Sequence, residues 1–320
     1  MLTPRVVVWM LSAGMMIVGT GAVSGQVYPN KPIRIVTADI GGGNDLLARI
    51  VAQGISGPLG QAVIVENRGA TVSGVIAAKA LPDGYTLLLA ANALWLGQFM
   101  QDMPYDAVKD FSPVTTVSNQ PVVLVVHPSL PAKSVKELIA LAKARPGELY
   151  YGSSATATVS HLAGELLKAM ADVNIVRVPF KGVGPALIAM FGSQVQLTFP
   201  TPSVVPQHVK AGRLRALAVS GLQPSPLLPD LPTISASGLP GYEVVSRAGI
   251  FAPAKTPAAV ISRLNQEIVR ALNSADVRER ILSLGSEPGG STPGEFRNMI
   301  KDNMARMGKV IKDAGMREDK

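Results

Sequence analysis

The sequence predicts an α/β fold in which mainly parallel sheets are flanked by helices. Short apolar runs typical of buried strands alternate with segments whose apolar residues recur at helical spacing, which is the pattern of successive βαβ units. The chain has 320 residues, enough for two lobes of ordinary domain size with separate cores. No internal repeat or low-complexity tract interrupts this alternation.

In the first half of the chain the alternation starts after residue 31. Apolar runs predict strands at 33–36, 62–66, 86–91 and 122–126. A helix-like segment follows each of the first three runs, near 45–56, 74–81 and 94–100. Because strands that alternate with helices usually pair in parallel, these segments predict one sheet covered by helices.

The second half repeats the pattern. Strands are predicted at 148–153, 174–180, 195–199 and 213–219, and helices near 160–171, 184–192 and 204–211. Ser134 is placed to cap a helix at 135–144, with Glu137 completing a capping box. Five prolines in 224–242 argue against a helix or a central strand, so a long ordered connection is predicted there. A strand within 242–254 and three helices finish the chain, and Thr292 caps the last helix.

Residues 1–25 have the features of an export signal. Arg5 precedes a mostly apolar run at 6–23, and small residues at 22, 24 and 25 offer a cleavage site before Gln26. An uncleaved membrane anchor is the alternative, because the run is roughly long enough to span a bilayer, although glycine, serine and threonine dilute it. The absence of cysteine from the sequence excludes a lipid-anchored start and any disulfide framework.

The charge pattern argues against nucleic-acid binding. The formal net charge is +8, from 30 basic and 22 acidic residues, and loss of residues 1–25 would remove one arginine and leave +7. Lys and Arg are scattered and never form the dense runs with exposed aromatic residues that favour binding to a phosphate backbone. A basic exported protein would instead attract anionic solutes.

A glycine loop at 39–45 follows the first predicted strand and precedes the first predicted helix. Backbone N–H groups at such a helix N-terminus favour an anion. The loop lacks the third glycine of a dinucleotide-binding loop, and the chain has no Gly-Lys-Ser/Thr sequence for a nucleotide phosphate. Two plainer interpretations stay open: a flexible turn without a ligand and, for Asp45, a helix N-cap.

The sequence contains no catalytic or metal-binding constellation. Cysteine is absent, and the serine-rich stretch 153–160 lacks the Gly-x-Ser-x-Gly elbow of a nucleophilic serine. The histidines, His127, His161 and His208, are far apart and have no partner at metal-binding spacing, so neither a metal nor a cofactor is expected. His161 follows a polar loop and could face a site. Since 153–160 also leads into a helix, two helix N-termini on facing lobes could hold one carboxylate.

Motifs spread over residues 28–315 occur together in one family. They include GGGNDLLARIVAQGISGPLGQAVIVENR, LPDGYTLLL, VVHPSLPAKSVKELIALAKARPGEL, SHLAGELLKAMA, VPFKGVGPAL and LPDLPTISASGLPGYE. With these motifs the chain resembles the Bug receptors, the extracytoplasmic solute-binding subunits of tripartite tricarboxylate transporters. The resemblance implies a periplasmic binding protein of type II-like fold that has two lobes, closes around a small carboxylate and has no enzymatic activity.

The same resemblance implies two crossings of the chain between the lobes. Lobe one is expected at 27–125 plus 248–320 and lobe two at 126–247, with crossing strands in VVLVV and GIFAPA, and the protein is expected to be a monomer. Hinge closure at such crossings is how many binding proteins trap solutes. The expected ligand-binding residues are Asp39, Ile40, Gly41, Gly42, Gly43, Asn44, Asp45, Asn92, Ser153, Ser154, Ala155, Thr156, Thr158, His161, Phe180, Lys181, Gly182, Pro200, Thr201 and Arg247.

Departures from the family pattern leave the ligand open. This chain has Thr37-Ala38-Asp39-Ile40 where the family usually has Pro-Phe-Pro-Pro, alanines at 155 and 157 for glycines, Pro200 for an acidic residue, and Arg247-Ala248 for an aromatic pair. We expect Arg247 to bond a ligand carboxylate bidentately, and Asp39 to orient Arg247 or to repel a second negative group. The alternative is a solvated rim on which both side chains point to water or pair with each other.

The predicted function is a receptor that delivers an organic anion to membrane transporter subunits. A periplasmic sensor that passes its ligand to a signalling partner would use the same pocket, so the sequence does not separate these two functions. An exported hydrolase or isomerase on a similar scaffold is the less favoured alternative, because a nucleophile paired with a base is missing.

Overall fold

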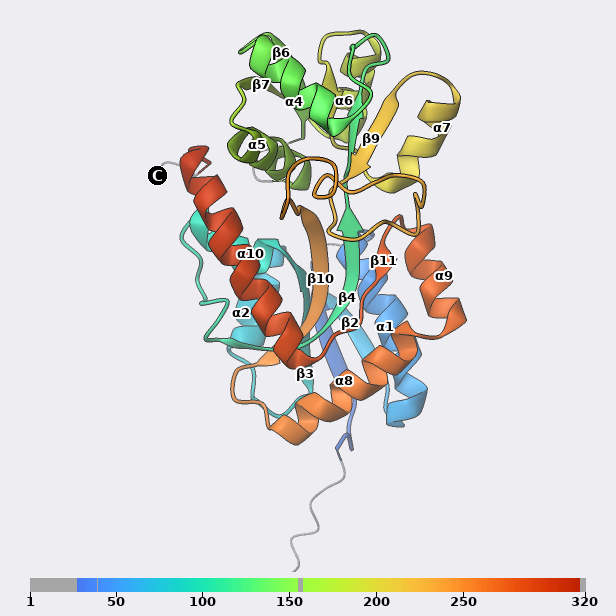
Figure 1. Cartoon of the computed structure of the whole chain (residues 1–320). Helices are drawn as coiled ribbons and strands as arrows, with labels where there is room; N and C mark the ends of the chain where they lie inside the picture. Colours follow the sequence, from blue (N-terminus) through green and yellow to red (C-terminus); the bar gives the residue numbers. More distant parts are fainter. Residues whose placement is uncertain (1–27, 39, 155–157, 317–320) are drawn as a thin grey trace, which may run out of the picture.

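The computed structural model describes residues 28–38, 40–154 and 158–316, and it has two lobes stacked along one long axis (Figure 1). Each lobe is built around one sheet, sheet A in lobe one and sheet B in lobe two. The predicted α/β class with two lobes is therefore confirmed. The export signal expected at 1–25 lies outside the described residues.

Sheet A has six strands: β1 (Ile33–Thr37), β2 (Val63–Asn67), β3 (Thr86–Ala91), β4 (Phe111–Pro121), β10 (Val245–Pro253) and β11 (Glu287–Pro288). Their order across the sheet is β11-β4-β10-β3-β1-β2. β1 pairs in parallel with β2 and β3, as the βαβ pattern predicted. β10 runs antiparallel to β3 and β4, and β11 runs antiparallel to β4, so the sheet as a whole is mixed.

Sheet B has five strands: β5 (Val123–Val126), β6 (Leu149–Ser153), β7 (Ile175–Pro179), β8 (Leu197–Thr198) and β9 (Arg215–Val219). Their order is β7-β6-β8-β5-β9. β6 pairs in parallel with β7 and β8, whereas β5 is antiparallel to β8 and β9. Every antiparallel pair involves a strand at a crossing between the lobes, β4, β5 or β10, which explains why the sheets are less parallel than predicted.

Helices cover both faces of each sheet. In lobe one, one face is covered by α1 (Gly43–Leu59), α8 (Ala258–Leu272) and α9 (Ala275–Ser283), and the other by α2 (Ala70–Ala78), α3 (Ala93–Leu96), η1 (Gly97–Phe99) and α10 (Pro293–Asp313). In lobe two, α4 (Val135–Ala144) and α5 (Val159–Ala171) cover one face, and α6 (Val183–Phe191), η2 (Pro202–Val204) and α7 (Val205–Lys210) the other. Strand alternation decides which side chain meets which layer: Leu87 and Leu89 face α1 and α8, and Leu88 faces α3 and α10.

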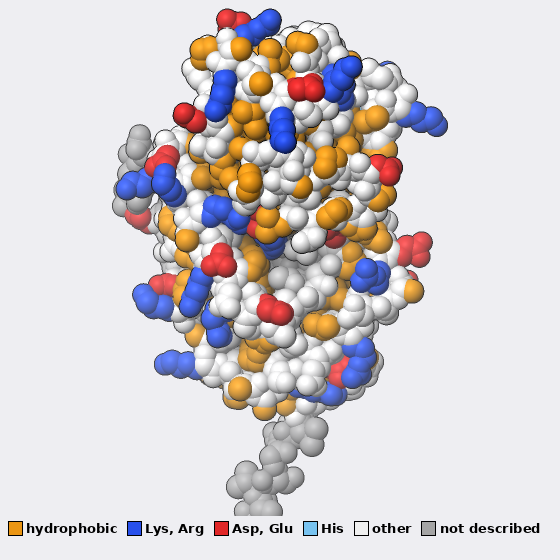
Figure 2. All heavy atoms as spheres, in the orientation of Figure 1, with side chains coloured by type: hydrophobic (Ala, Val, Ile, Leu, Met, Phe, Trp, Pro, Cys, Tyr) orange, Lys and Arg blue, Asp and Glu red, His pale blue; other side chains and the backbone are white. Residues whose placement is uncertain are grey.

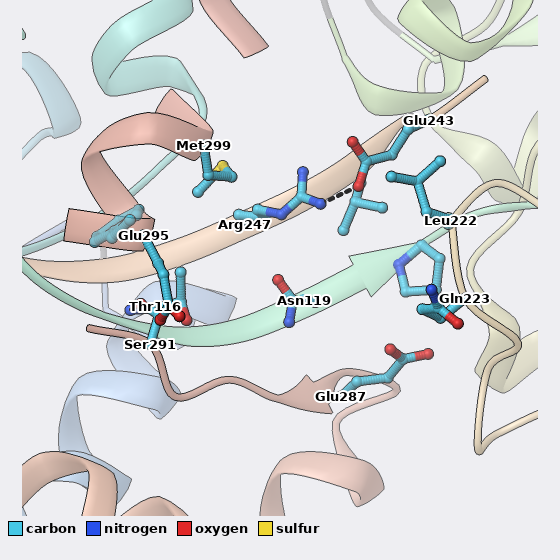
Figure 3. A pocket seen from close by; sticks show the side chains of 14 residues that line it. Thr116, Asn119, Leu222, Gln223, Glu243, Arg247, Glu287, Ser291, Glu295 and Met299 are labelled. Atoms are coloured by element: carbon cyan, nitrogen blue, oxygen red, sulfur yellow. Dashed lines mark hydrogen bonds and ion pairs between the residues drawn. The ribbon is translucent and has the colours of Figure 1, made fainter. Parts of the chain in front are cut away.

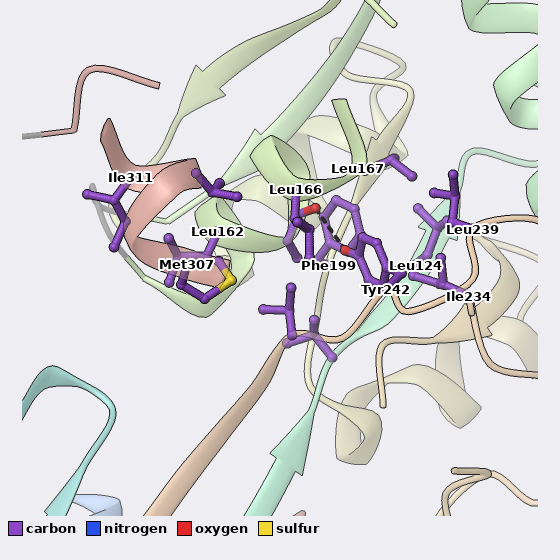
Figure 4. Packing of buried hydrophobic residues seen from close by; sticks show 14 of the residues in the cluster. Leu124, Leu162, Leu166, Leu167, Phe199, Ile234, Leu239, Tyr242, Met307 and Ile311 are labelled. Atoms are coloured by element: carbon purple, nitrogen blue, oxygen red, sulfur yellow. Dashed lines mark hydrogen bonds between the residues drawn. The ribbon is translucent and has the colours of Figure 1, made fainter. Parts of the chain in front are cut away.

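One hydrophobic cluster extends through both lobes. It contains Trp95 and Phe296 in lobe one and Tyr242 in lobe two, all at most 1% exposed. Met307 of α10 lies beside Leu162 of α5 in this cluster (Figure 4). α10 therefore extends beyond sheet A and packs against lobe two.

The chain passes between the lobes at two neighbouring strands. β4 is followed by β5 after Val122 alone, and β10 starts where the connection out of lobe two ends. β4 and β10 are paired over most of their length, from Val245 opposite Pro121 to Pro253 opposite Phe111. The lobe bounds predicted at 125/126 and 247/248 fall next to these crossings and stay a prediction.

Several local predictions can be compared with the structure. Residues 224–242 contain no helix and no strand longer than an isolated bridge, as their prolines predicted. Thr292 and Glu295 form the predicted capping box of α10. Ser134 caps α4, but the Glu137 carboxylate accepts from the N–H of Lys133, at 2.7 Å, instead of closing a box with Ser134. β4 and β11 were not predicted.

The surface carries no single-sign charge patch on the face seen in Figure 2, where Lys and Arg are interspersed with Asp, Glu and apolar side chains. Within residues 28–38, 40–154 and 158–316, no helix combines the length and apolar character needed to span a bilayer. The membrane-anchor alternative concerned 6–23, which lies outside those ranges.

Candidate functional site

The first loop joins β1 to α1 at the end of lobe one that faces lobe two. Gly41 has a φ of 78°, a left-handed conformation that favours glycine, and Ile40 is 80% exposed. Gly42 is the N-cap residue of α1 and has no side chain to accept from the first N–H groups of the helix, which lack partners within it. The first of these N–H groups belong to Gly43 and Asn44. A helix N-terminus of this kind favours an anion, and the anion site expected from sequence stays a prediction. Asp39 lies outside the described residues.

Asp45 holds this loop in shape. Its carboxylate is 2% exposed and accepts from the N–H of Gly41 and from Asn67 Nδ2, both at 2.9 Å, and it pairs with Arg49 Nε at 2.9 Å. Burial opposes ionisation, but these hydrogen bonds and Arg49 outweigh it and hold the pKa of Asp45 below its ordinary value. Asp45 is the third residue of α1, so the alternative that made it the N-cap is wrong, because Gly42 occupies that position.

The second loop joins β6 to α5 in lobe two, and hydroxyl groups organise it. Ser154 Oγ bonds to Thr158 Oγ1 at 2.7 Å and to Ser160 Oγ at 2.8 Å. Arg177 of β7 supports the loop from beneath, donating to Ser153 Oγ at 2.8 Å and to the carbonyl of Ser154 at 3.1 Å. Thr158 is the N-cap residue of α5. Ala155 and Thr156 lie outside the described residues.

Asn92 follows β3 and extends its pairing with β10. Its Nδ2 donates to the carbonyl of Val245 at 2.9 Å, and its Oδ1 accepts from the N–H of Arg247 at 2.7 Å. The side chain thus continues the ladder that ends at Ala91 and Ala248. Its amide therefore holds the crossing strand β10 through both its donor and its acceptor.

The remaining predicted positions in lobe two lie after β7 and β8. Lys181 is exposed, and Gly182, with a φ of 128°, is the N-cap residue of α6. Phe180 is half-buried against the lobe-two core. Pro200 is buried and its carbonyl accepts from the N–H of Val123 at 2.8 Å. Thr201 lies beside Ser203, with the two hydroxyl oxygens 3.3 Å apart.

His161 lies where α5 meets the end of α10. It is 4% exposed and its Nε2 is 3.9 Å from Glu165 Oε1. Burial, with Arg177 nearby, lowers the pKa of His161 to about 4, so the ring is neutral at pH 7. A shallow cavity at this point is lined by His161, Glu165, Lys168, Arg177 and residues 313–316.

A cavity of about 280 Å³ begins at the first loop and runs into lobe one; we call it the first-loop cavity. Ala38 and Asn44 of the loop lie at one end. The end of β3, the start of α2, and α3 with the segment after it form the walls. The full lining is Ala38, Asn44, Ala70, Thr71, Ser73, Leu88, Leu89, Ala90, Ala91, Ala93, Leu94, Gly97, Met100, Gln101, Met103 and Tyr105.

A second cavity, of about 320 Å³, lies over the two crossing strands and is called the crossing-strand cavity. Figure 3 shows Asn119, Arg247 and Glu287 on the neighbouring strands β4, β10 and β11, with Glu243 next to the guanidinium. Residues 221–223 of lobe two and the first turns of α10 complete the lining. None of the described residues of the first or second loop lines it.

Arg247 is already paired in this cavity. Its Nη2 bonds to Glu243 Oε1, and the other oxygen of that carboxylate accepts from Arg306 Nη2 at 2.6 Å. Burial alone would raise the pKa of Glu243, but the two arginines outweigh burial and hold it below its ordinary value. The pKa of Glu287, by contrast, is raised above its ordinary value, because burial disfavours the charged form of its carboxyl group. The expected contact between Arg247 and a ligand stays a prediction, and the Glu243 pair does not have to open for it, because Arg247 Nη1 is buried without a hydrogen-bond partner among the described residues.

Sequence reasoning named the two loops but missed the residues that shape them. Asn67 and Arg177 were not predicted, and neither was Glu243 of the crossing-strand cavity, although a charged residue inside the apolar run IVRVP was a usable signal for Arg177. Of the predicted residues, Asn44 lines the first-loop cavity and Arg247 the crossing-strand cavity, so these two do not share a cavity. Among the described residues, no cluster of three or more His, Asp or Glu side chains is arranged to hold a metal ion.

Two lobes built on separate mixed sheets, joined by a pair of strands and presenting glycine-rich and serine-rich loops at helix N-termini, define a bilobal solute-binding protein. The chain belongs to the tripartite tricarboxylate transporter family receptors, whose family model matches residues 47–316. It is 36% identical to the protein BugT of Bordetella pertussis over 301 residues, covering 92% of each chain. The predicted resemblance to Bug receptors is thereby confirmed.

Solved structures agree with this assignment. The chain is 35% identical to Rpa4515 of R. palustris, solved with adipate, with a TM-score of 0.68 and coverage of 90% of this chain and 98% of that one. It is 28% identical to MatC of Rhodopseudomonas palustris, solved with malate, with a TM-score of 0.64 and coverage of 89% and 100%. The periplasmic binding protein BugD has a TM-score of 0.66 at 30% identity, covering 91% of this chain and all of that one.

Proposed function

We propose that this protein is a periplasmic receptor that captures a small carboxylate between its lobes and delivers it to the membrane subunits of a tripartite tricarboxylate-type transporter. Family membership supports the receptor role, and the carboxylates bound by Rpa4515 and MatC support the solute class. In this role the protein binds its solute without transforming it, acts as a monomer, and is exported with loss of residues 1–25.

The arrangement of the first loop carries this proposal. Asp45 turns its carboxylate inward to Asn67 and Arg49, so the negative charge closest to the start of α1 is neutralised within the protein. The N-cap residue Gly42 leaves the first N–H groups of the helix to an external acceptor. A ligand carboxylate satisfies those N–H groups and benefits from the helix dipole.

The second loop would complete the grip when the lobes close. Arg177 and the hydroxyls of Ser154, Thr158 and Ser160 hold the start of α5 in place. Ser154 and Thr158 are therefore proposed as ligand contacts, whereas Ser153, which is fully buried and accepts from Arg177, would support the loop. Asp39, Ala155 and Thr156 keep the roles hypothesised from sequence. Closure is proposed to turn on the paired strands β4 and β10.

The decisive experiment is a thermal-shift screen of the exported protein against organic acids, followed by calorimetry and product analysis of each hit. A ligand at a hundred times its dissociation constant should add about 2.7 kcal/mol of stability. Binding of a carboxylate that is recovered unchanged supports the proposal. Chemical conversion of the hit, or a screen in which only uncharged solutes stabilise the protein, would refute it.

A further inference from the structure

The first-loop cavity lies next to the proposed carboxylate site. Ala38, which directly follows β1, and Asn44, the second residue of α1, flank the first loop and line the cavity, so the loop that would hold the ligand head group lies at the cavity's near end. Ala91 and Ala93, which flank Asn92 at the end of β3, line the same space. A ligand whose carboxylate bonds the start of α1 therefore has this cavity within reach of its remaining atoms.

The described part of the cavity wall carries no charged side chain. Its described lining residues include no Asp, Glu, Lys, Arg or His, and most of the wall is apolar, with Leu88, Leu94, Met100 and Met103 among its side chains. The hydroxyl of Ser73 is already committed, because it donates to the carbonyl of Thr37 at 2.8 Å. A charged group placed here would lose its hydration without gaining a counter-charge, which is strongly unfavourable.

The space suits a short chain or a single ring. At about 280 Å³ it is several times the roughly 30 Å³ that one water occupies in the liquid. The cavity is wide because part of its wall consists of small residues, Ala90, Ala91, Ala93 and Gly97. The unbranched side chains of Met100 and Met103 can adjust to ligands of different shapes. An apolar body of about five or six carbons would displace water from an apolar surface here.

We propose that the first-loop cavity is a subsite for the apolar body of the ligand, so that this receptor selects monocarboxylates with an aliphatic or aromatic end over dicarboxylates of the same length. This inference rests on the proposed function, since it assigns the carboxylate to the first loop. The proposed ligand preference differs from the ligands bound by Rpa4515 and MatC, since adipate and malate each carry a second carboxylate.

Calorimetry on the wild-type protein with hexanoate and adipate tests the proposal directly, because these six-carbon acids differ only at the distal end. We expect hexanoate to bind at least tenfold more tightly than adipate. Across the series from propionate to hexanoate, affinity should rise about fourfold with each methylene, the gain expected for burying one such group. Adipate binding as tightly as hexanoate, or a flat series, would overturn the subsite.

Filling the cavity supplies the second arm. Ala90 is half-buried on the same strand face as Leu88, so Ala90→Leu should occupy the subsite and weaken hexanoate binding at least tenfold while leaving propionate within twofold. Ala216→Leu is the matched control, since Ala216 is also a half-buried strand alanine lining a cavity, in lobe two. Equal hexanoate affinity in both variants contradicts the subsite. Failure of every carboxylate, including adipate and malate, to bind the wild type would instead refute the proposed function.

Discussion

The first-loop cavity and the crossing-strand cavity treat charge in opposite ways. The first-loop cavity has no charged side chain in its described lining, whereas the crossing-strand cavity contains Glu243, Arg247 and Glu287. The Glu243 carboxylate accepts from both Arg247 and Arg306, so these three side chains together keep one excess positive charge. A ligand carboxylate entering there would share Arg247 with Glu243, whereas at the first loop it would meet the N-terminus of α1. The two cavities therefore offer different sites for a ligand carboxylate, and the substitutions below distinguish them.

The strongest test removes the shared carboxylate. Glu243→Gln leaves Arg247, 13% exposed, and Arg306, 29% exposed, without their counter-charge. Since breaking a buried ion pair leaves an uncompensated charge, the free energy of unfolding should fall by about 3 kcal/mol. Urea unfolding followed by circular dichroism measures this loss, and the affinity for a confirmed ligand should stay within twofold.

Glu66→Gln is the matched control for that substitution. Glu66 also bridges two arginines, Arg34 at 3.2 Å and Arg68 at 2.9 Å, but its side chain is 27% exposed and theirs are 44% and 53% exposed. Solvent screens such pairs, so the loss should be about 0–1 kcal/mol. Equal losses at Glu243 and Glu66 would show that burial of the crossing-strand pair contributes nothing.

Arg247→Ala asks whether that cavity takes part in binding. The hypothesis from sequence, in which Arg247 bonds a ligand carboxylate, predicts affinity weaker by about ten- to a hundredfold, since such bonds contribute about 1.5–3 kcal/mol. With the guanidinium paired to Glu243, we expect a lower melting temperature and a dissociation constant within twofold of the wild type. Calorimetry with a confirmed ligand decides between the two, and a tenfold loss in a fully folded variant would restore the hypothesis from sequence.

Glu287→Gln should give the smallest and most pH-dependent effect. Burial raises the pKa of Glu287, so its folded state favours the protonated form, and the stability this provides is present at low pH and lost as pH rises through the folded pKa. The glutamine variant should therefore melt up to about 2 °C above the wild type at pH 7 and lose that advantage near pH 4. An advantage that grows on acidification would contradict this assignment.

The sequence was most informative where one physical signal dominated. β1 and β3 are mostly apolar runs, with Arg34 the exposed exception in β1, and the capping box of α10 is entirely local, so pattern alone located them. β4 was missed because Phe111–Pro121 mixes Thr, Ser, Asn and proline with few apolar residues, and it is a strand because it pairs with β10, more than a hundred residues away. The βαβ pattern could not show that the crossing strands pair antiparallel.

The candidate site shows the same difference between local signals, which the sequence reveals, and long-range contacts, which it does not. The two loops could be located because glycines and hydroxyl residues before a helix are local signals. Their supports could not, since Asn67 reaches Asp45 across 22 positions and Arg177 reaches Ser154 across 23. Arg247 was assigned to the ligand from its place in the chain, while its partner Glu243, four residues earlier, is held in addition by Arg306 of α10.

The extension of α10 onto lobe two has a consequence for how the protein unfolds. Met307 and Ile311 belong to one hydrophobic cluster with side chains from both sheets. Neither lobe can lose its packing without exposing apolar surface that the other lobe also buries, so heating should melt both lobes in a single calorimetric transition. Proteolytic removal of the last two turns of this helix would weaken both halves at once, although the cut falls in only one of them.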